Sequence, residues 1–377
     1  MINLNFPLPI FRNAKEIVSG ENARYALKGI KSNTTAIICS SHFQNSNYFE
    51  QILKLTKSEN VQFFLKDWFG DITLEKIKGI SSKIFELKPD LIIAIGGGSI
   101  IDAAKVIWAK YECPEMSDDL LFRPFSLNTL RSCSKFVAIP TTVGTGSEVS
   151  SSAVVLDPKS GSKKAIVTHQ FLPDVVILDP NLALEVPITI QIETAADALT
   201  HSIEGYTSKI INPLMDYFAE QSVNMIARQL KKLLIGEINI STISELQIAA
   251  MFAGWVQNHC LVGMSHAIAH QLAPYNFSHG AANAILMPWV LEFNSKDENI
   301  RNRYSLFAKK IGVGDDVNDL IKIFDSVKPF LNLPKNLQDK FDCESISKNA
   351  LLDPNAKVNP KIFNESDVVN VLKNAYK

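Results

Sequence analysis

The stretch DLIIAIGGGSIIDAAKVIWA, residues 90–109, decides the fold of the first half of the chain. Residues 90–95 are an apolar run that predicts a buried β-strand, and a helical pattern begins at Ser99. The glycines between them allow a phosphate to approach the backbone amides at the start of the helix, where the helix dipole favours an anion. A plain strand-to-helix turn would explain one glycine more easily than three. The spacing is not GxGxxG, so the general dinucleotide fingerprint does not apply directly.

The preceding residues alternate the same two kinds of element. Strands are predicted at 34–41 and 61–67, with a helix from about 49 to 58 between them, and another helix follows Thr73. Strands alternating with helices imply a parallel sheet with helices on its faces. Such sheets bind ligands beyond the carboxyl ends of their strands.

A second candidate binding loop is IPTTVGTGSEVSSSAVV, residues 139–155, which follows a strand-like run. Its hydroxyl and amide groups suit a phosphate or a ribose, although a flexible Ser/Gly linker is the alternative. Residues 157–179 predict a hairpin, because turn residues separate two β-branched runs. Lys163 and Lys164 could contact a cofactor, but exposed lysine pairs are usually only solvated.

Strand patterns become scarce after Pro187. Helices are predicted instead at 188–208, 213–234, 242–257, 260–274, 297–312 and 315–332, with a short one after Asn364. We therefore expect an α/β domain over residues 1–183 and an all-helical domain over 184–377.

The second half of the chain also contains five of the seven histidines. Asp197 and His201 are four residues apart, as are His266 and His270, so each pair shares one face of a helix. Together with His279 they could bring one carboxylate and several imidazoles to a divalent transition metal with an open position. Taken singly, each histidine is more often a packed or surface residue, yet burying this many polar rings without a shared partner is costly.

Composition narrows the class of protein. The chain has 377 residues, 46% of them hydrophobic, with 38 basic and 39 acidic residues, so nucleic acid is not expected as a partner. The five scattered cysteines form no CxxC pair, which favours a reducing compartment over a disulfide framework. Neither a signal peptide nor an apolar run long enough to span a bilayer is apparent. We expect a soluble cytoplasmic protein without a membrane partner.

Five ordered motifs resemble those of the iron-containing (group III, metal-dependent) alcohol dehydrogenase family, and the resemblance covers nearly the whole chain. They are GGGSIIDAAK (96–105), IPTTVGTGSEVS (139–150), AADALTHSIEGY (195–206), GMSHAIAHQL (263–272) and SHGAANAI (278–285). The segment 353–376 also resembles the end of the family's chains. The implied fold is a Rossmann-like parallel-sheet domain followed by an all-α domain, as in dehydroquinate synthase-like proteins.

The resemblance implies a role for each matching residue. The metal ligands fall on Asp197, His201, His266 and His279. His270 matches a histidine near the nicotinamide that is often assigned to proton relay, and Asp102, expected near the nicotinamide ribose, joins it as a catalytic candidate. Cofactor contacts are expected from Ser41, Asp71, Gly97, Gly98, Ser99, Asp102, Thr141, Thr142, Thr145, Ser147 and Lys163.

Four positions depart from the family's pattern. Ser41 replaces a common acidic residue, which removes repulsion toward a 2′-phosphate and favours NADP over NAD, and Asp71 replaces a frequent Asn. The loop before His279 is one residue shorter than usual and contains Pro274, so it must be rebuilt. His259, where Asn is common, lies two helical turns before the first histidine of the GMSHAIAHQL motif. It either lines the substrate pocket or is a packed or surface histidine.

The resemblance implies reversible hydride transfer between a primary alcohol or its aldehyde and the nicotinamide of NAD or NADP. Fe²⁺ is the expected metal, with Zn²⁺ as an alternative, and a homodimer or larger homo-oligomer is expected. Two other functions stay open. One is a specialised pathway reductase acting on a polyol or on a phosphorylated or phosphonate aldehyde. The other is a non-catalytic cofactor-binding subunit.

Overall fold

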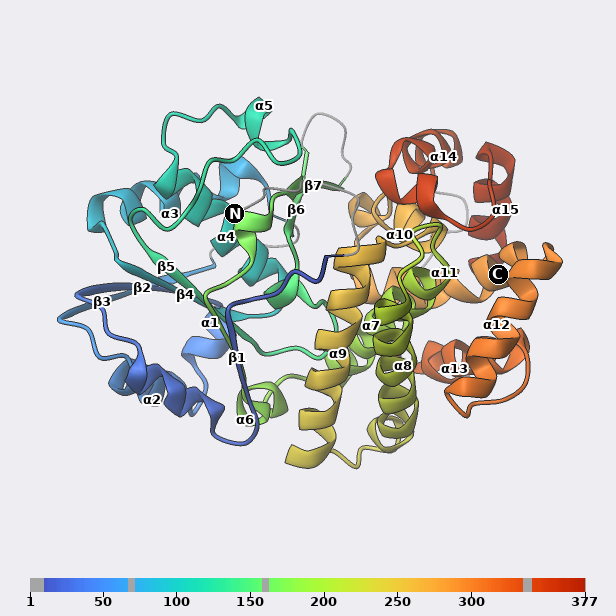
Figure 1. Ribbon diagram of the computed structural model, residues 1–377, viewed down its shortest axis with the longest axis horizontal. Coiled ribbons are helices and arrows are strands. Elements are labelled where there is room, and N and C mark those ends of the chain that lie inside the picture. The colour runs from blue at the N-terminus through green and yellow to red at the C-terminus, as the bar shows by residue number, and fades with distance from the viewer. Residues whose placement is uncertain (1–9, 67–71, 158–162, 335–340, 377) are drawn as a thin grey trace. The chain divides into compact units, whose positions relative to one another are not determined.

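The computed structural model describes residues 10–66, 72–157, 163–334 and 341–376. The chain forms two compact units. The first unit comprises residues 1–142, 147–158 and 164–186. The second unit comprises residues 143–146, 159–163 and 187–377. Most of their helices and strands are labelled in Figure 1.

The first unit is built on a six-stranded sheet with the strand order β1-β8-β5-β4-β2-β3, in which every neighbouring pair is parallel. Its strands are β1 (Glu16–Ser19), β2 (Thr34–Cys39), β3 (Asn60–Leu65), β4 (Leu91–Gly96), β5 (Lys135–Pro140) and β8 (Val175–Leu178). The predicted parallel sheet is therefore confirmed. The predicted strand 34–41 ends at Cys39 because the Ser40 side chain caps the next helix, accepting a hydrogen bond from the Phe43 amide at 3.2 Å.

Helices flank this sheet. They are α1 (Ser41–Gln44), α2 (Phe49–Leu55), α3 (Leu74–Leu87), α4 (Gly98–Glu112), α5 (Asp118–Leu121) and α6 (Pro180–Leu184), with 3₁₀ turns at Ala23–Gly29, Ser147–Val149 and His169–Phe171. Every residue of β4 is buried: Ile92 and Ala94 pack with α3 and α4, while Ile93 and Ile95 pack on the opposite face with α2. Burial on both faces explains why β4 is a continuous apolar run rather than an alternating one.

The hairpin predicted over residues 157–179 is wrong. The strand β7 (Lys163–Val167) pairs with the preceding strand, β6 (Ser152–Leu156), in a separate two-stranded sheet. The last run of the segment, β8, enters the main sheet between β1 and β5, parallel to both. Local sequence shows two strands separated by turn residues, but it does not show that their partners lie elsewhere.

The described part of the second unit after residue 187 contains helices and no strand. They are α7 (Ile188–Thr207), α8 (Pro213–Leu234), α9 (Ile240–Cys260), α10 (Met264–Ala269), α11 (His279–Asn294), α12 (Glu298–Lys310), α13 (Val317–Val327), α14 (Cys343–Leu352) and α15 (Glu365–Ala375), with 3₁₀ turns at Ala273–Tyr275, Lys328–Phe330 and Pro354–Val358. The prediction of an all-helical region is confirmed.

The helix predicted over 260–274 is wrong in its extent. Helix α9 continues to Cys260, and Leu261 then has φ 57° and ψ −175°, a conformation that ends the helix. The following helix, α10, has only six residues. Two further helices, α11 and α14, were not predicted, and Pro288 lies inside the first of these.

Candidate metal centre

Helix α7 carries the first two candidate ligands. Asp197 and His201 lie one turn apart, and 2% and 3% of their surfaces are exposed. Sixteen residues of this 20-residue helix are buried, so the helix is surrounded by protein rather than amphipathic. A buried carboxylate and imidazole on such a helix require polar partners.

Helix α10 supplies His266, which is buried, and ends at His270. The turn at Leu261 lets the chain enter this short helix through Gly263. A Cβ atom at Gly263 would lie 2.9 Å from the Glu204 carboxylate and 2.7 Å from the Asn359 side-chain oxygen. Glycine is needed here because two polar side chains approach its backbone closely.

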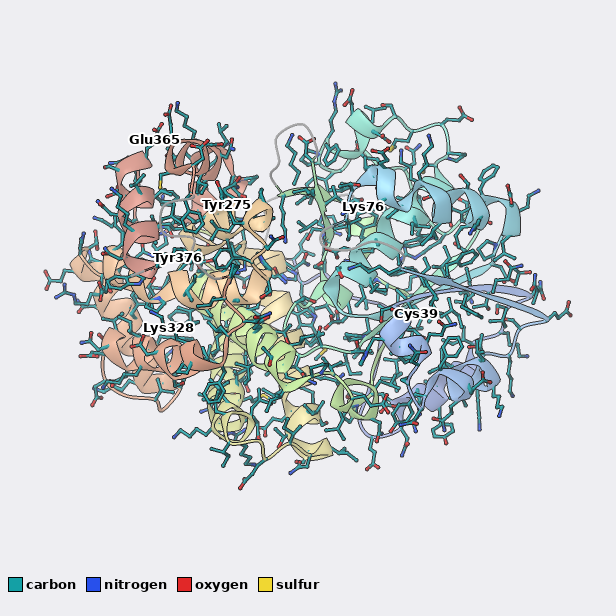
Figure 2. All side chains as sticks on the ribbon, turned by 180° about the vertical axis from the view of Figure 1, so that it is seen from behind. Cys39, Lys76, Tyr275, Lys328, Glu365 and Tyr376 are labelled. Atoms are coloured by element: carbon teal, nitrogen blue, oxygen red, sulfur yellow. The ribbon has the colours of Figure 1, made fainter. Side chains whose placement is uncertain are left out.

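The loop that precedes His279 contains Pro274, which lies in a 3₁₀ turn. Ser278 caps α11, accepting from the Ala281 amide and donating to Glu193 at 2.7 Å. Aromatic rings also pack against the loop. Phe341 lies between Tyr275 and Tyr376, with ring centroids 4.9 and 4.7 Å away; both tyrosines are labelled in Figure 2.

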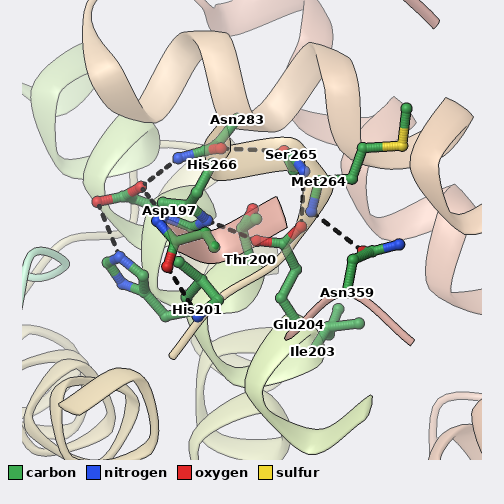
Figure 3. Close-up of polar contacts among 12 residues, drawn as sticks. Asp197, Thr200, His201, Ile203, Glu204, Met264, Ser265, His266, Asn283 and Asn359 are labelled. Carbon is green, nitrogen blue, oxygen red and sulfur yellow. Dashed lines mark hydrogen bonds and ion pairs between the residues drawn. The ribbon is translucent and has the colours of Figure 1, made fainter. Parts of the chain in front are cut away.

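These elements bring the four predicted ligands together. One ligand atom from each of Asp197, His201, His266 and His279 lies within 4.8 Å of the others. The Asp197 carboxylate is 3.7 Å from the Nε2 atoms of His266 and His279 and 3.9 Å from that of His201. All three distances are too long for hydrogen bonds. The close-up in Figure 3 shows Asp197, His201 and His266 gathered at one point.

The donor set fits a divalent transition metal. The Nε2 atom of His266 is buried and, among the described residues, has no hydrogen-bond partner. A buried ring nitrogen without a partner costs free energy, and a metal ion would remove that cost. One carboxylate and three imidazoles are ligands typical of Fe²⁺ or Zn²⁺.

The charges within the cluster are coupled. Burial alone would raise the pKa of Asp197, but the neighbouring histidines hold the pKa below its usual range. Burial lowers the pKa of His201 to about 4. Burial also opposes charge on His266, but the nearby carboxylates of Asp197 and Glu204, the second of which is hydrogen-bonded to the ring, raise its pKa to about 9. The site thus combines a carboxylate with imidazoles, and a bound metal ion would take the place of protons on the imidazole nitrogens.

Two residues that sequence reasoning missed hold the candidate ligands. Glu204 accepts hydrogen bonds from the Ser265 amide at 2.7 Å and from His266 Nδ1 at 2.6 Å. Asn283 donates to Asp197 at 2.9 Å and accepts from the Ser265 hydroxyl at 2.9 Å. Glu204 follows Asp197 by seven residues, so two-turn helical spacing could have indicated it.

The other two histidines of this region are not among the four clustered residues, although the His270 ring lies beside those of His279 and His266, with ring centroids 5.3 and 6.2 Å away. His270 donates from Nδ1 to Asp353 at 2.7 Å, and 13% of its side chain is exposed. His259 donates from Nδ1 to the Trp255 carbonyl, 2.7 Å away and one turn earlier on α9. A contact of this kind is available to any histidine near the end of a helix, so it gives no support to the predicted place of His259 in a substrate pocket.

In the first unit, the predicted cofactor residues gather at the carboxyl ends of β4 and β5. Gly97 caps α4, which starts at Gly98 and Ser99, and the Thr141 amide donates to the Gly96 carbonyl at 3.0 Å. A Cβ atom on Gly97 would lie 3.1 Å from the Thr142 methyl group. The Thr142 hydroxyl is buried and, within the described chain, has no hydrogen-bond partner. An open helix start beside this hydroxyl fits a phosphate-bearing cofactor.

The remaining predicted cofactor residues are less tightly grouped. Asp102 accepts hydrogen bonds from the Ser147 hydroxyl and from the Val154 amide. Ser41 is exposed at the start of α1, and Lys163 begins β7. Asp71 lies outside the described residues.

The loop 143–146, which belongs to the second unit, contains Thr145. Its glycines pack on helices: a Cβ atom on Gly144 would lie 1.9 Å from the Thr194 carbonyl oxygen, and one on Gly146 would lie 2.4 Å from the Gly254 Cα. Packing therefore explains these two glycines without a cofactor. The Thr145 carbonyl accepts from Gln257 at 2.7 Å.

Comparison with known proteins identifies the family. The model of the iron-containing alcohol dehydrogenases matches residues 14–180, and that of the C-terminal domain of Fe-containing alcohol dehydrogenases matches residues 191–376. The chain belongs to the iron-containing alcohol dehydrogenase family. It is an NAD(P)-linked alcohol dehydrogenase, an oxidoreductase that acts on a small alcohol or aldehyde.

Individual relatives match along nearly their whole length. The NADPH-dependent butanol dehydrogenase of Clostridium saccharobutylicum is 30% identical, and the alignment covers 99% of this chain and 98% of the relative. The 1-propanol dehydrogenase of Citrobacter freundii is also 30% identical, over 95% and 97% of the two chains. The iron-containing alcohol dehydrogenase of Thermococcus thioreducens superposes with a TM-score of 0.86 at 28% identity, over 97% and 99% of the chains. Among the described residues, no helix is both long enough and apolar enough to cross a bilayer.

Proposed function

We propose that this enzyme catalyses reversible hydride transfer between a primary alcohol or its aldehyde and NADP, with a divalent metal held by Asp197, His201, His266 and His279. The observation that carries the proposal is their convergence within 4.8 Å, together with a buried His266 nitrogen that finds no hydrogen-bond partner in the described part of the chain. Fe²⁺ is the proposed native ion. Because Zn²⁺ stands above Fe²⁺ in the Irving–Williams order, Zn²⁺ would compete for the same ligands.

A bound metal supplies Lewis-acid catalysis, and the nicotinamide supplies or accepts the hydride. The chain itself then has to orient the substrate oxygen and move one proton. His270 is the proposed proton carrier: its Nδ1 donates to Asp353 at 2.7 Å, which fixes the ring and leaves Nε2 to exchange the proton. The side chain is 13% exposed, which provides contact with solvent.

Most of the proposed nucleotide contacts belong to the first unit. Gly97, Gly98 and Ser99 at the start of α4 are proposed to bind the pyrophosphate. Further contacts are proposed from Asp102, Thr141, Thr142, Thr145, Ser147 and Lys163. Two arguments support NADP over NAD: exposed Ser41 replaces a carboxylate that would repel a 2′-phosphate, and a relative 30% identical is an NADPH-dependent butanol dehydrogenase.

The same proposal covers the organisation of the protein. Residues 1–183 would bind the nucleotide, and residues 184–377 would bind the metal and the substrate. We also propose that the protein is a cytoplasmic homodimer or larger homo-oligomer. Light scattering of the purified protein measures its oligomeric state.

The test is activity of metal-stripped protein reloaded anaerobically with Fe²⁺ or Zn²⁺. Oxidation of NADH and of NADPH is followed with a panel of short straight-chain aldehydes. We expect metal-dependent turnover, faster with NADPH. The His266→Ala variant should lose turnover by roughly 10³-fold or more, because a ligand is missing, while it binds NADPH with unchanged affinity. Full activity in that variant would refute the ligand assignment. Metal and nucleotide binding without turnover of any simple aldehyde would contradict the proposed substrate class.

A further inference from the structure

Glu204 is a buried carboxylate on α7 with only 3% of its surface exposed. Within the described residues it forms no salt bridge with a lysine or an arginine, and its ion-pair partner is His266. A buried carboxylate with a single titratable partner is costly for stability alone. The presence of this carboxylate in the helix that carries two candidate ligands therefore needs an explanation other than stability.

Its two oxygens each receive one N–H donor. The Ser265 amide donates to Oε1 at 2.7 Å, and His266 Nδ1 donates to Oε2 at 2.6 Å, as Figure 3 shows. A carboxylate only accepts hydrogen bonds, so His266 must carry a proton on Nδ1. The lone pair of the neutral ring then lies on Nε2, the atom that faces Asp197 at 3.7 Å.

The backbone at Gly263 allows the Glu204 side chain to approach helix α10 closely. Gly263 leaves room that a Cβ atom would fill at 2.9 Å from the Glu204 oxygen. The Ser265 hydroxyl extends the arrangement by donating to Asn283, which donates in turn to Asp197. One group of hydrogen bonds therefore orients two of the four candidate ligands.

We propose that Glu204 is a positioning residue that fixes the Nδ1–H tautomer of His266 and thereby presents Nε2 to the metal. This inference rests on the proposed metal site. It also predicts why glutamine would fail at position 204. The Ser265 amide has to keep the side-chain oxygen as its acceptor, so the amide NH₂ of glutamine would face His266 Nδ1. Nδ1 would then have to accept, and the ring proton would move to Nε2, where it blocks the metal.

Zinc affinity of the metal-stripped protein tests this directly, measured by competition with a chromophoric chelator. We expect Glu204→Gln to weaken Zn²⁺ binding by roughly 10- to 100-fold, the usual effect of losing a partner of a ligating histidine. Glu204→Asp should retain more affinity, because a carboxylate is kept. Asp216→Asn is the control: it makes the same acid-to-amide change on α8, where the carboxylate accepts from Arg303, and should leave zinc affinity unchanged.

A second measurement keeps the proposal testable if the variants fold poorly. In the zinc-loaded wild-type protein labelled with ¹⁵N-histidine, NMR should show a hydrogen-bonded Nδ1–H on His266, assigned by its loss in His266→Ala. An unprotonated Nδ1 would overturn the proposal. Wild-type zinc affinity in Glu204→Gln would also overturn it while leaving the metal site intact. A wild-type protein that binds no zinc would instead overturn the proposed function and this role together.

Discussion

At the scale of single residues, Ser41 is where nucleotide preference should be decided. It is exposed at the first position of α1, directly beyond the carboxyl end of β2. In Ser41→Asp, the new carboxylate would repel a 2′-phosphate by about 1 kcal/mol or more at close range, so we expect the Kd for NADPH to rise by about tenfold and that for NADH to be unchanged or lower. Nucleotide fluorescence titration measures both. Ser82→Asp places the same charge on an exposed position of α3 and serves as the control. Equal effects in the two variants would exclude a specific role for Ser41.

Glu148 offers a pH-dependent prediction at the same scale. Burial raises its pKa from 4.5 to about 7, with a smaller contribution from Asp102. Between these values the folded state holds a proton that the unfolded state releases. The contribution of Glu148 to stability is thus complete below pH 4.5 and lost as the pH rises through 7.

Glutamine resembles the protonated acid at every pH. The free energy of unfolding of Glu148→Gln should therefore equal that of the wild type near pH 4.5. Above pH 7 it should be larger than that of the wild type, by up to roughly 3 kcal/mol. Urea unfolding at the two pH values measures this difference, with Glu86→Gln, an exposed position on α3, as the control. A constant difference across the range would contradict the assigned pKa.

At the scale of elements, helix α4 holds the second predicted cofactor loop through a buried lysine. The Lys105 ammonium donates to the carbonyls of Ser147, Ser150 and Ser152 at 2.6, 2.9 and 2.8 Å. Asp102, one turn earlier, binds the Ser147 hydroxyl and the Val154 amide. Together, these side chains fix the shape of the segment that follows the glycines.

Replacing Lys105 by methionine would leave several buried carbonyls without donors, at about 1–3 kcal/mol each. We expect Lys105→Met to lower the free energy of unfolding by roughly 3 kcal/mol or more and to weaken NADPH binding by about tenfold, with zinc affinity retained. Lys110→Met on the same helix, whose partner Asp118 is exposed, is the control. A destabilised variant with unchanged NADPH affinity would show that the lysine supports the fold and not the nucleotide.

Elements were predictable from sequence where local pattern determines them. The continuous apolar run of β4 predicted both its type and its extent, and the predicted bounds 188–208 and 213–234 agree with α7 and α8 to within one residue. The hairpin prediction failed because β7 pairs with the preceding strand β6, whereas β8 pairs with β1 and β5, which are distant in sequence. The end of α9 was missed because Leu261 adopts a positive φ without being glycine. The site shows the same limit: helical spacing indicated a metal site, and the family resemblance narrowed it to four candidate ligands, whose role stays a prediction. Neither could show that Glu204 and Asn283 hydrogen-bond to these ligands.

At the scale of the whole molecule, the proposed metal site lies within one of the two units. The four candidate ligands, and the Glu204 and Asn283 side chains that hold them, all belong to the second unit. The glycine turn at the start of α4 belongs to the first.

Metal binding should therefore not depend on the nucleotide. We expect nucleotide-free protein to bind one Zn²⁺ per chain, and zinc at about 100 times its Kd should stabilise the folded state by about 2.7 kcal/mol. Thermal unfolding at increasing zinc concentration measures this, and the Kd for Zn²⁺ should be the same when NADPH is present. The His266→Ala variant should show little stabilisation by zinc. Zinc binding that appears only after NADPH is added would contradict the prediction, because the second unit would then lack a preformed site.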